Sequence, residues 1–234
     1  MIRGDSENRL VRTFRPRRRR LGSEMLGVYE RQLSRFALDE SGPRIDLDAE
    51  FGRRAQRILE IGCGRGDLAN EHALRFPNHD IVAVDVHTRG IANILATIER
   101  HGLDNLRVVE GDALVFLDRL DDSSFDEVWV FFPDPWVKPR QRARRLVRTD
   151  VVDRLVRIIS PGGYLRTATD IEDYARQMRN VLSGCRWLDG VDESRPDWRT
   201  ETVFERRGHD AGRGSVDLCA RRNELRWRPE SADV

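Results

Sequence analysis

The sequence predicts an α/β protein with a doubly wound, mainly parallel sheet and an antiparallel hairpin at its C-terminal edge. Short apolar runs alternate with amphipathic segments of helical length between about residues 56 and 183, and the connections between them are short. The tail that follows has two strand-like pieces, at 202–206 and 215–221, with no helix expected between them. Parallel strands require crossover helices, whereas neighbouring strands without one pair in antiparallel fashion.

The strands of the parallel part are expected at five apolar runs, each followed closely by glycine, proline or an acidic residue. These turn signals set the strand boundaries. The runs cover residues 58–61, 81–85, 106–109, 125–132 and 164–168. The helices between them are expected at 67–76, 88–101, shortly after 112, at 151–159 and at 171–182.

Residues 1–22 are expected to form a flexible basic arm, because eight arginines fall in the first 20 residues without apolar periodicity. Residues 23–234 are expected to form one domain. It begins with a helix over 23–41, whose apolar face includes Leu26, Tyr29 and Leu33. A core at 56–183 and a C-terminal part at 184–228 follow.

The composition excludes several classes of protein. The 41 Lys+Arg and 40 Asp+Glu residues nearly cancel, which excludes a uniformly basic histone-like protein and an acidic disordered one. No apolar run approaches the ~18 residues of a membrane span, and none follows the basic start as in a secretory signal. Cys63, Cys185 and Cys219 are too far apart for a CxxC zinc site, and the five histidines lack metal-ligand spacing. We expect a cytoplasmic protein with no structural metal and no membrane association.

Acidic residues follow the ends of the predicted parallel strands. Ligands of open α/β sheets bind outside the carboxyl ends of the strands. One acid there is ordinary turn chemistry, and tight turns with capping acids are an alternative interpretation. Five acids on one rim favour a ligand site. They are Glu60, Asp85, Asp112, Asp134 and Asp170.

A glycine-rich loop, Gly62-Cys63-Gly64-Arg65-Gly66, follows the first strand. A dinucleotide fingerprint would carry its third glycine one residue later, and Asp67 would repel a pyrophosphate at the start of the helix. Glu60 and the loop instead resemble the Glu-x-Gly-x-Gly-x-Gly segment of Rossmann-like methyltransferases that use S-adenosylmethionine. That donor is a sulfonium cation without phosphate, so nearby acids favour its binding.

The same resemblance gives roles to five residues of the rim and the loop. Glu60, Gly62 and Gly64 are expected to bind the cofactor. Asp85 follows the loop by about twenty residues, where an acid can accept both ribose hydroxyls. Asp112 resembles the residue that receives the adenine amino group.

The fourth strand ends in Phe132-Pro133-Asp134-Pro135-Trp136-Val137-Lys138. This segment resembles the Phe-Pro-Asp-Pro-Trp-x-Lys signature of bacterial tRNA (guanine-N7-)-methyltransferases. The resemblance extends over most of the chain, through Arg12-Thr13-Phe14, the glycine loop, Val86-His87, Arg144-Arg145-Leu146, Thr169-Asp170, Thr202 to Gly208 and Val216-Asp217-Leu218. The chain departs from the family pattern at Asp85, where glutamate is commoner, and at Val137, Pro139 and Gln141.

The resemblance implies a fold, a reaction and a set of functional residues. The fold is the Rossmann-like methyltransferase sheet, and the reaction transfers a methyl group from S-adenosylmethionine to N7 of a guanosine in the variable loop of tRNA, at position 46, without an obligatory protein partner. Asp134 is implied as the catalytic residue, close to the sulfonium of the cofactor. The substrate side is implied to comprise Lys138, Asp170, Thr202 and Glu205.

Basic residues follow the signature segment directly and are expected to contact RNA together with the basic arm. They are Lys138, Arg140, Arg142, Arg144, Arg145 and Arg148. Trp136 has two interpretations, as a platform for an extruded guanine or as an anchor of its own loop. Two alternative functions stay open: a methyltransferase for another nucleic-acid site or a small molecule, and a non-catalytic RNA-binding protein with the same fold.

Overall fold

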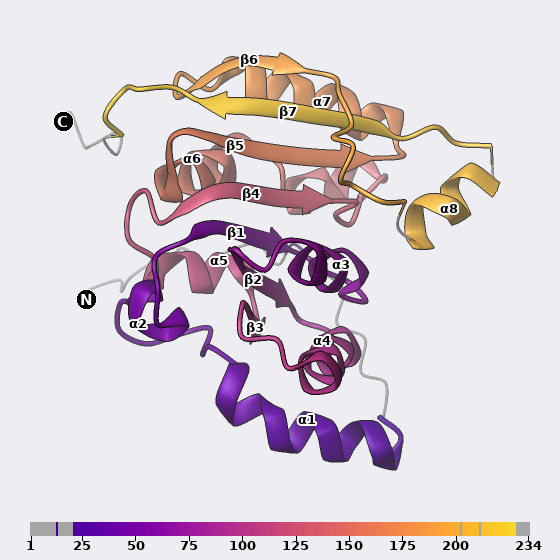
Figure 1. The fold of residues 1–234 in the computed structure, drawn as a ribbon. Coiled ribbons are helices and arrows are strands. Elements are labelled where there is room, and N and C mark those ends of the chain that lie inside the picture. Colours follow the sequence, from indigo (N-terminus) through magenta and orange to yellow (C-terminus); the bar gives the residue numbers. More distant parts are fainter. Residues whose placement is uncertain (1–12, 14–20, 202, 211, 228–234) are drawn as a thin grey trace, which may run out of the picture.

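The computed structural model describes Thr13 and residues 21–201, 203–210 and 212–227. The arginine-rich part of the predicted basic arm lies outside the described residues, as does Thr202. The described chain forms one seven-stranded sheet in the order β3-β2-β1-β4-β5-β7-β6 (Figure 1). The strands are β1 Gln56–Ile61, β2 His79–Asp85, β3 Leu106–Glu110, β4 Phe125–Phe131, β5 Ile159–Thr169, β6 Leu188–Asp192 and β7 Val216–Arg222.

The pairing of the strands confirms the predicted fold class. β1 to β5 run parallel to one another, β7 pairs with β5 in antiparallel fashion, and β6 pairs with β7 in the same way. The chain leaves β1 towards β2 on one side, and β4 lies on the other side. In doubly wound sheets this reversal opens a crevice at the carboxyl ends of the two central strands.

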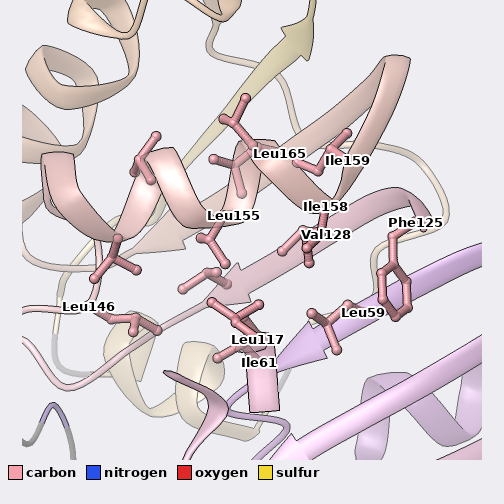
Figure 2. Close-up of a cluster of buried hydrophobic side chains, with 14 of the residues drawn as sticks. Leu59, Ile61, Leu117, Phe125, Val128, Leu146, Leu155, Ile158, Ile159 and Leu165 are labelled. Carbon is pink, nitrogen blue, oxygen red and sulfur yellow. The ribbon is translucent and has the colours of Figure 1, made fainter. Parts of the chain in front are cut away.

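Helices cover both faces of the sheet (Figure 1). Successive β1 residues point to opposite faces, so Ile58 packs in one apolar cluster with α3 and α4, while Leu59 and Ile61 pack in the other with α6 and α7. Figure 2 shows part of this second cluster, in which Leu155 lies over the sheet. The helices are α1 Ser23–Phe36, α2 Leu47–Phe51, α3 Asp67–Arg75, α4 Thr88–His101, α5 Ala113–Phe116, α6 Thr149–Ile158, α7 Glu172–Gly184 and α8 Val203–Asp210. Two short 3-10 helices are η1 Leu117–Arg119 and η2 Pro139–Arg144.

The predicted strand at 202–206 is wrong, because Val203–Asp210 is the helix α8. The antiparallel partner of β7 is instead β6, at Leu188–Asp192. This strand follows α7 after a tight turn, in which the Leu188 N–H donates to the carbonyl of Cys185 at 3.1 Å. As an edge strand it is mostly exposed and polar, so it lacks the alternation of a half-buried strand.

Residues 193–201 form a crossing segment between β6 and α8. Trp198 from this segment stacks on Trp129 of β4, with ring centroids 4.4 Å apart, and meets the edge of His72 of α3 at 5.1 Å. The Thr200 hydroxyl donates to Glu71 at 2.6 Å. The crossing segment therefore ties the C-terminal part to β4 and α3, beside the carboxyl end of the sheet.

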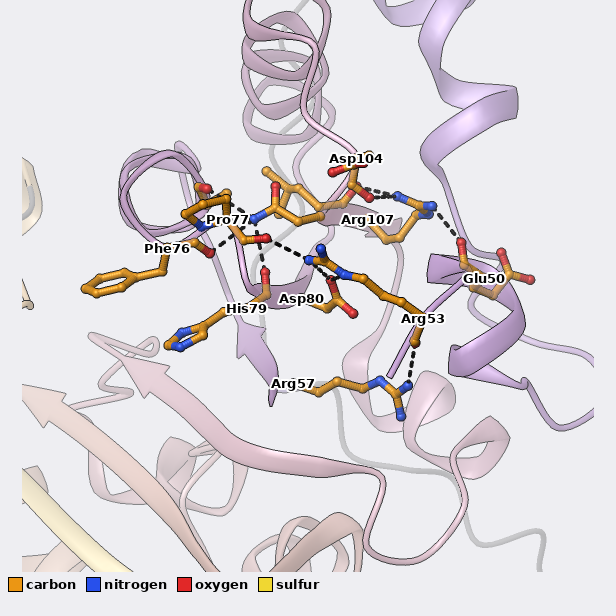
Figure 3. Close-up of polar contacts among 12 residues, drawn as sticks. Glu50, Arg53, Arg57, Phe76, Pro77, His79, Asp80, Asp104 and Arg107 are labelled. Atoms are coloured by element: carbon orange, nitrogen blue, oxygen red, sulfur yellow. Dashed lines mark hydrogen bonds and ion pairs between the residues drawn. The ribbon is translucent and has the colours of Figure 1, made fainter. Parts of the chain in front are cut away.

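The amino end of the sheet is closed by a cluster of polar contacts (Figure 3). The Arg53 guanidinium donates twice to Asp80, which is fully buried, at 2.9 and 2.5 Å. The Asn105 amide donates to the carbonyls of Ala73 and His79 at 3.1 and 3.0 Å. Both Arg53 bonds go to Oδ1 of Asp80, and these contacts join residues of the chain to one another. We therefore interpret this end as structural and place the functional site at the carboxyl end.

Candidate active site

A pocket of about 480 Å³ opens at the carboxyl ends of β1, β2 and β4. Most of its lining comes from the loops that follow four parallel strands, at residues 60–68, 84–87, 111–113 and 131–135. Thr13, Leu146, Asp170 and Arg213 complete it. The structure thus gathers all five predicted rim acids around one cavity and adds a sixth, Asp67.

The glycine loop can approach its neighbours closely because it lacks side chains at two contacts. Gly66 has a φ of +76°, and a Cβ there would lie 2.3 Å from Ile94 of α4. A Cβ on Gly90, in the first turn of α4, would lie 1.8 Å from the carbonyl oxygen of Gly64. Gly90 lies outside the glycine motif, so the sequence pattern did not identify it as part of the site.

Asp85, at the end of β2, fixes the glycine loop from the opposite side. One carboxylate oxygen accepts the Gly64 N–H at 2.7 Å. The other accepts the His87 N–H at 2.9 Å and lies 2.6 Å from Nδ1 of the His87 ring. Asp85 therefore lines the pocket and also holds the glycine loop in place.

Glu60 is buried at the base of the pocket, with 4% of its surface exposed. Burial, together with the negative charge of Asp85, raises its pKa to about 8. One of its oxygens, Oε2, is buried without a hydrogen-bond partner among the described residues. A buried carboxyl group of this kind can accept a hydrogen bond from a cationic ligand.

Asp112 caps α5, because its carboxylate accepts the Leu114 N–H at 2.9 Å. Its own N–H donates to Glu40 Oε2 at 2.5 Å, and a Cβ on Gly111 would meet the same Glu40 carboxylate at 2.1 Å. Glu40 therefore shapes this corner of the pocket from a segment far away in sequence. The residues around Glu40 carry no motif, and the sequence analysis did not identify it.

Asp134 lies on the loop that follows β4, half-buried and facing the pocket. Two residues of this loop have left-handed backbone conformations although they are not glycine: Phe132 at φ +50° and Trp136 at φ +40°. The Trp136 indole is buried and donates to the carbonyl of Thr13 at 2.8 Å. Trp136 is therefore the anchor of its loop rather than an exposed stacking platform.

The basic residues after the signature segment divide into two groups. Lys138, Arg140, Arg142 and Arg144 are exposed, and Lys138 lies outside the pocket lining. Arg145 is 1% exposed and Arg148 pairs with Asp150 at 2.7 Å. The expectation that all six contact RNA is wrong for Arg145, because its guanidinium is buried and hydrogen-bonded to other residues of the chain.

The predicted substrate-side residues occupy different environments. Asp170 lines the pocket and accepts from Arg213 Nε at 2.7 Å. Glu205 is fully buried outside the pocket lining, and its carboxylate accepts from both terminal nitrogens of Arg199 at 2.9 and 3.0 Å. Arg195 and Ser215 also donate to it, at 2.5 and 2.7 Å. The geometry brings Asp170, but not Lys138 or Glu205, to the pocket.

The Glu205 network ties α8, the crossing segment and β7 to the start of the Asp134 loop. Arg199 also pairs with Asp217 of β7 at 2.6 Å, and its guanidinium lies 5.1 Å from the ring centroid of Phe131 at the end of β4. Burial alone would raise the pKa of Glu205, but the hydrogen bonds from Arg199, Ser215 and Arg195 outweigh it and hold the pKa below its usual range. Glu205 is therefore a buried anion.

Within the described part of the chain, no group of histidine, cysteine and acidic side chains could hold a metal ion. The three cysteines are buried free thiols. None of the described helices has the length and apolar character to cross a membrane.

Comparison with known proteins gives the fold and the family of the chain. A solved 16S rRNA methyltransferase, KamB, has the same fold, with a TM-score of 0.55 and 16% identity over 78% of this chain and 95% of that one. A family model described as "Putative methyltransferase" matches residues 54–218. The tRNA (guanine-N(7)-)-methyltransferase of Nitrosomonas eutropha is 45% identical over 195 residues, covering 82% of this chain and 87% of the relative. That of Methylococcus capsulatus is 40% identical over 221 residues, covering 92% and 95%.

The fold and the match to the family model define a Rossmann-like methyltransferase. The identity of 40–45% to the two relatives, over most of both chains, identifies the family within this class. The chain belongs to the family of bacterial tRNA (guanine-N7-)-methyltransferases.

Replacing Gly90 by alanine should separate α4 from the glycine loop, because the added Cβ meets a backbone oxygen that cannot rotate away. We expect Gly90→Ala to lower the free energy of unfolding by roughly 1–3 kcal/mol, measured by urea denaturation. Gly184→Ala, at the end of α7, is the matched control, since its Cβ would enter open space. Equal stability of the two variants would contradict the close approach.

Replacing Glu205 by glutamine should make stability less dependent on acid pH. The lowered pKa means that the Glu205 carboxylate stabilises the fold above about pH 4.3, its unfolded value, and loses this effect as pH falls through the lower folded value. We expect Glu205→Gln to cost about 3 kcal/mol at pH 7 and clearly less below pH 4, in urea titrations at both pH values. A difference that does not change with pH would refute the assignment of a buried anion.

Proposed function

We propose that this enzyme transfers the methyl group of S-adenosylmethionine to N7 of a guanosine in the variable loop of tRNA, at position 46, and that it acts in the cytoplasm without an obligatory protein partner. The observation that carries the proposal is the acid-lined pocket beside the Asp134 loop, in a chain of this family. Residues 56–183 would form the cofactor-binding core, and residues 184–228 the substrate side.

The residues of the pocket fit S-adenosylmethionine. Six acidic side chains line it, against the two arginines Arg65 and Arg213, so the cavity favours a ligand with a sulfonium and an ammonium group. The unpartnered Oε2 of Glu60 suits an ammonium donor at the base of the pocket. Asp85 and Asp112, which line the pocket at the next two strand ends, would accept hydrogen bonds from the ribose hydroxyls and the adenine amino group.

The chemistry needs positioning more than proton transfer. When bound, S-adenosylmethionine would supply a methyl carbon made electrophilic by its cationic sulfur. Guanine N7 has an in-plane lone pair and no hydrogen, so the new N–C bond would form without a base. The electron pair of the broken C–S bond would remain on sulfur, and the positive charge would pass to the guanine ring. Asp134 can hold the N–H edge of the guanine and offset that charge, which would stabilise the transition state electrostatically.

The exposed cations near the pocket support an RNA substrate. Lys138 directly precedes η2, and Arg140, Arg142 and Arg144 lie within it, where they could neutralise phosphates. Asp170 at the pocket lining, and Thr202, would lie on the substrate side. Glu205 would act there indirectly, through the arginines and the serine that it binds.

The function is tested by transfer of a labelled methyl group to unmodified tRNA, followed by chemical cleavage at 7-methylguanosine. We expect Asp134→Ala to lower the rate of transfer at saturating tRNA by on the order of 10²–10³-fold, because the charge that offsets the product is lost. Far-UV circular dichroism and the unfolding midpoint should stay close to those of the parent protein. Label without cleavage would favour another methylation site, and binding without label a non-catalytic RNA-binding protein.

Glu60 should couple cofactor binding to proton release. Its pKa of about 8 means that the folded protein, but not the unfolded chain, keeps this carboxyl protonated near pH 7, so stability falls as pH rises from about 4.3 to 8. The free energy of unfolding of Glu60→Gln, taken relative to the parent, should therefore be higher at pH 7 than at pH 4.5 by on the order of 1–3 kcal/mol. The same substitution should weaken the binding of S-adenosylmethionine. Calorimetry in buffers of different ionisation enthalpy measures the protons released, and release by the Glu60→Gln variant equal to that of the parent would contradict this role.

A further inference from the structure

Arg145 differs from the basic residues around it. Its neighbour Arg144 and the other η2 arginines, Arg140 and Arg142, are exposed, whereas Arg145 is 1% exposed. It lies just after η2, between the Asp134 loop and α7. Its burial removes it from the surface that can meet RNA phosphates, so the sequence position alone does not explain why an arginine stands here.

The Arg145 guanidinium joins the Asp134 loop to α7. Nε donates to the carbonyl of Pro135 at 2.8 Å. The two terminal nitrogens donate in other directions, to Gln177 and to Asp173 of α7, each at 2.7 Å. The group lies 4.6 Å from the ring centroid of Tyr174, which is fully buried. Planar guanidinium geometry, unlike an ammonium, serves three such directions at once.

The Asp134 loop depends on side chains from outside it. Pro133 and Pro135 have no N–H, so the residues on either side of Asp134 cannot donate backbone hydrogen bonds. Phe132 and Trp136 hold left-handed conformations that cost of order 1–3 kcal/mol each unless their surroundings impose them. The carbonyl of Pro135, next to Asp134, is held by Arg145.

We infer that Arg145 is a positioning residue, which fixes the carboxylate of Asp134 for methyl transfer by holding the carbonyl of Pro135 against α7, and that it does not contact RNA. The inference rests on the proposed function for the meaning of that position. A displacement of about 1 Å at a reacting centre costs on the order of 10²-fold in rate. Arg145 therefore acts on the rate of the bound complex, whereas the exposed arginines act on tRNA affinity.

The test is the substitution Arg145→Lys, which keeps the charge and removes the planar fork. An RNA contact tolerates this change, because lysine also binds phosphate. A positioning residue does not, so we expect kcat for tRNA methylation to fall by on the order of 10²-fold, with little change in KM for tRNA. The conservative variant thus separates the two roles.

Arg157→Lys is the matched control. Arg157 is another largely buried arginine, which donates to the carbonyls of Leu117 and Leu120 and to Asp122, on the opposite side of the fold from the Asp134 loop. It should lower the unfolding midpoint as Arg145→Lys does, with no change in kcat. A second test variant, Asp173→Asn, keeps Arg145 and weakens its hydrogen bond to α7. We expect kcat to fall by a smaller factor than in Arg145→Lys, and this variant provides the test if Arg145→Lys does not fold.

Hydrogen exchange gives a readout that does not need the reaction. In Arg145→Lys, the amides of Asp134, Trp136 and Val137 should exchange faster than in the parent, while those of β4 stay protected; Arg157→Lys should leave the three unchanged. Unchanged kcat with a raised KM for tRNA in Arg145→Lys, or equal losses of kcat in both lysine variants, would overturn the inference. Absence of methyl transfer by the parent protein would refute the proposed function instead, and the exchange comparison would still decide how the loop is held.

Discussion

The contact between the glycine loop and α4 is the constraint on which the pocket depends. The carbonyl of Gly64 lies where a side chain on Gly90 would have to be, so the loop can close over β1 only against a bare helix turn. Asp85 completes the arrangement by accepting the Gly64 N–H from the end of β2. The end of β2 and the first turn of α4, more than twenty residues after Gly64, thus set the conformation of the loop, and the cavity beside it follows from that conformation.

Two buried arginines perform a comparable task for the Asp134 loop. Arg199 lies against Phe131 at the end of β4, before Asp134, and Arg145 holds the carbonyl just after it. Each is neutralised by carboxylates, Arg199 by Glu205 and Asp217, and Arg145 by Asp173. A buried ion pair is weak evidence for stability but specifies geometry well, because leaving either partner unpaired is costly. The two buried arginines thus lie on either side of the Asp134 loop, whose left-handed residues need surroundings that hold them in place.

Much of the fold could be predicted from the sequence, because apolar periodicity and turn residues are local signals. The five parallel strands and the helices between them follow these signals, and the rim acids follow from strand ends. The exchange of strand for helix at 203–210 could not be foreseen, since α8 is held by the buried Glu205 pairs and β6 is too polar to show alternation. Glu40 and Gly90 support loops of the pocket through tertiary packing, and Arg145 looks identical to its exposed neighbours in sequence.

The edges of the sheet have a consequence for behaviour at high concentration. On one side, β3 is covered where the Leu38 N–H donates to the carbonyl of Val108 at 2.8 Å. On the other side, β6 has an irregular register between Asp189 and Asp192 and exposes both carboxylates. A strand from a second molecule would meet broken spacing and like charge there. The regular strand β7 lies inside this edge, paired with β5 and β6, so we expect little intermolecular pairing through the sheet.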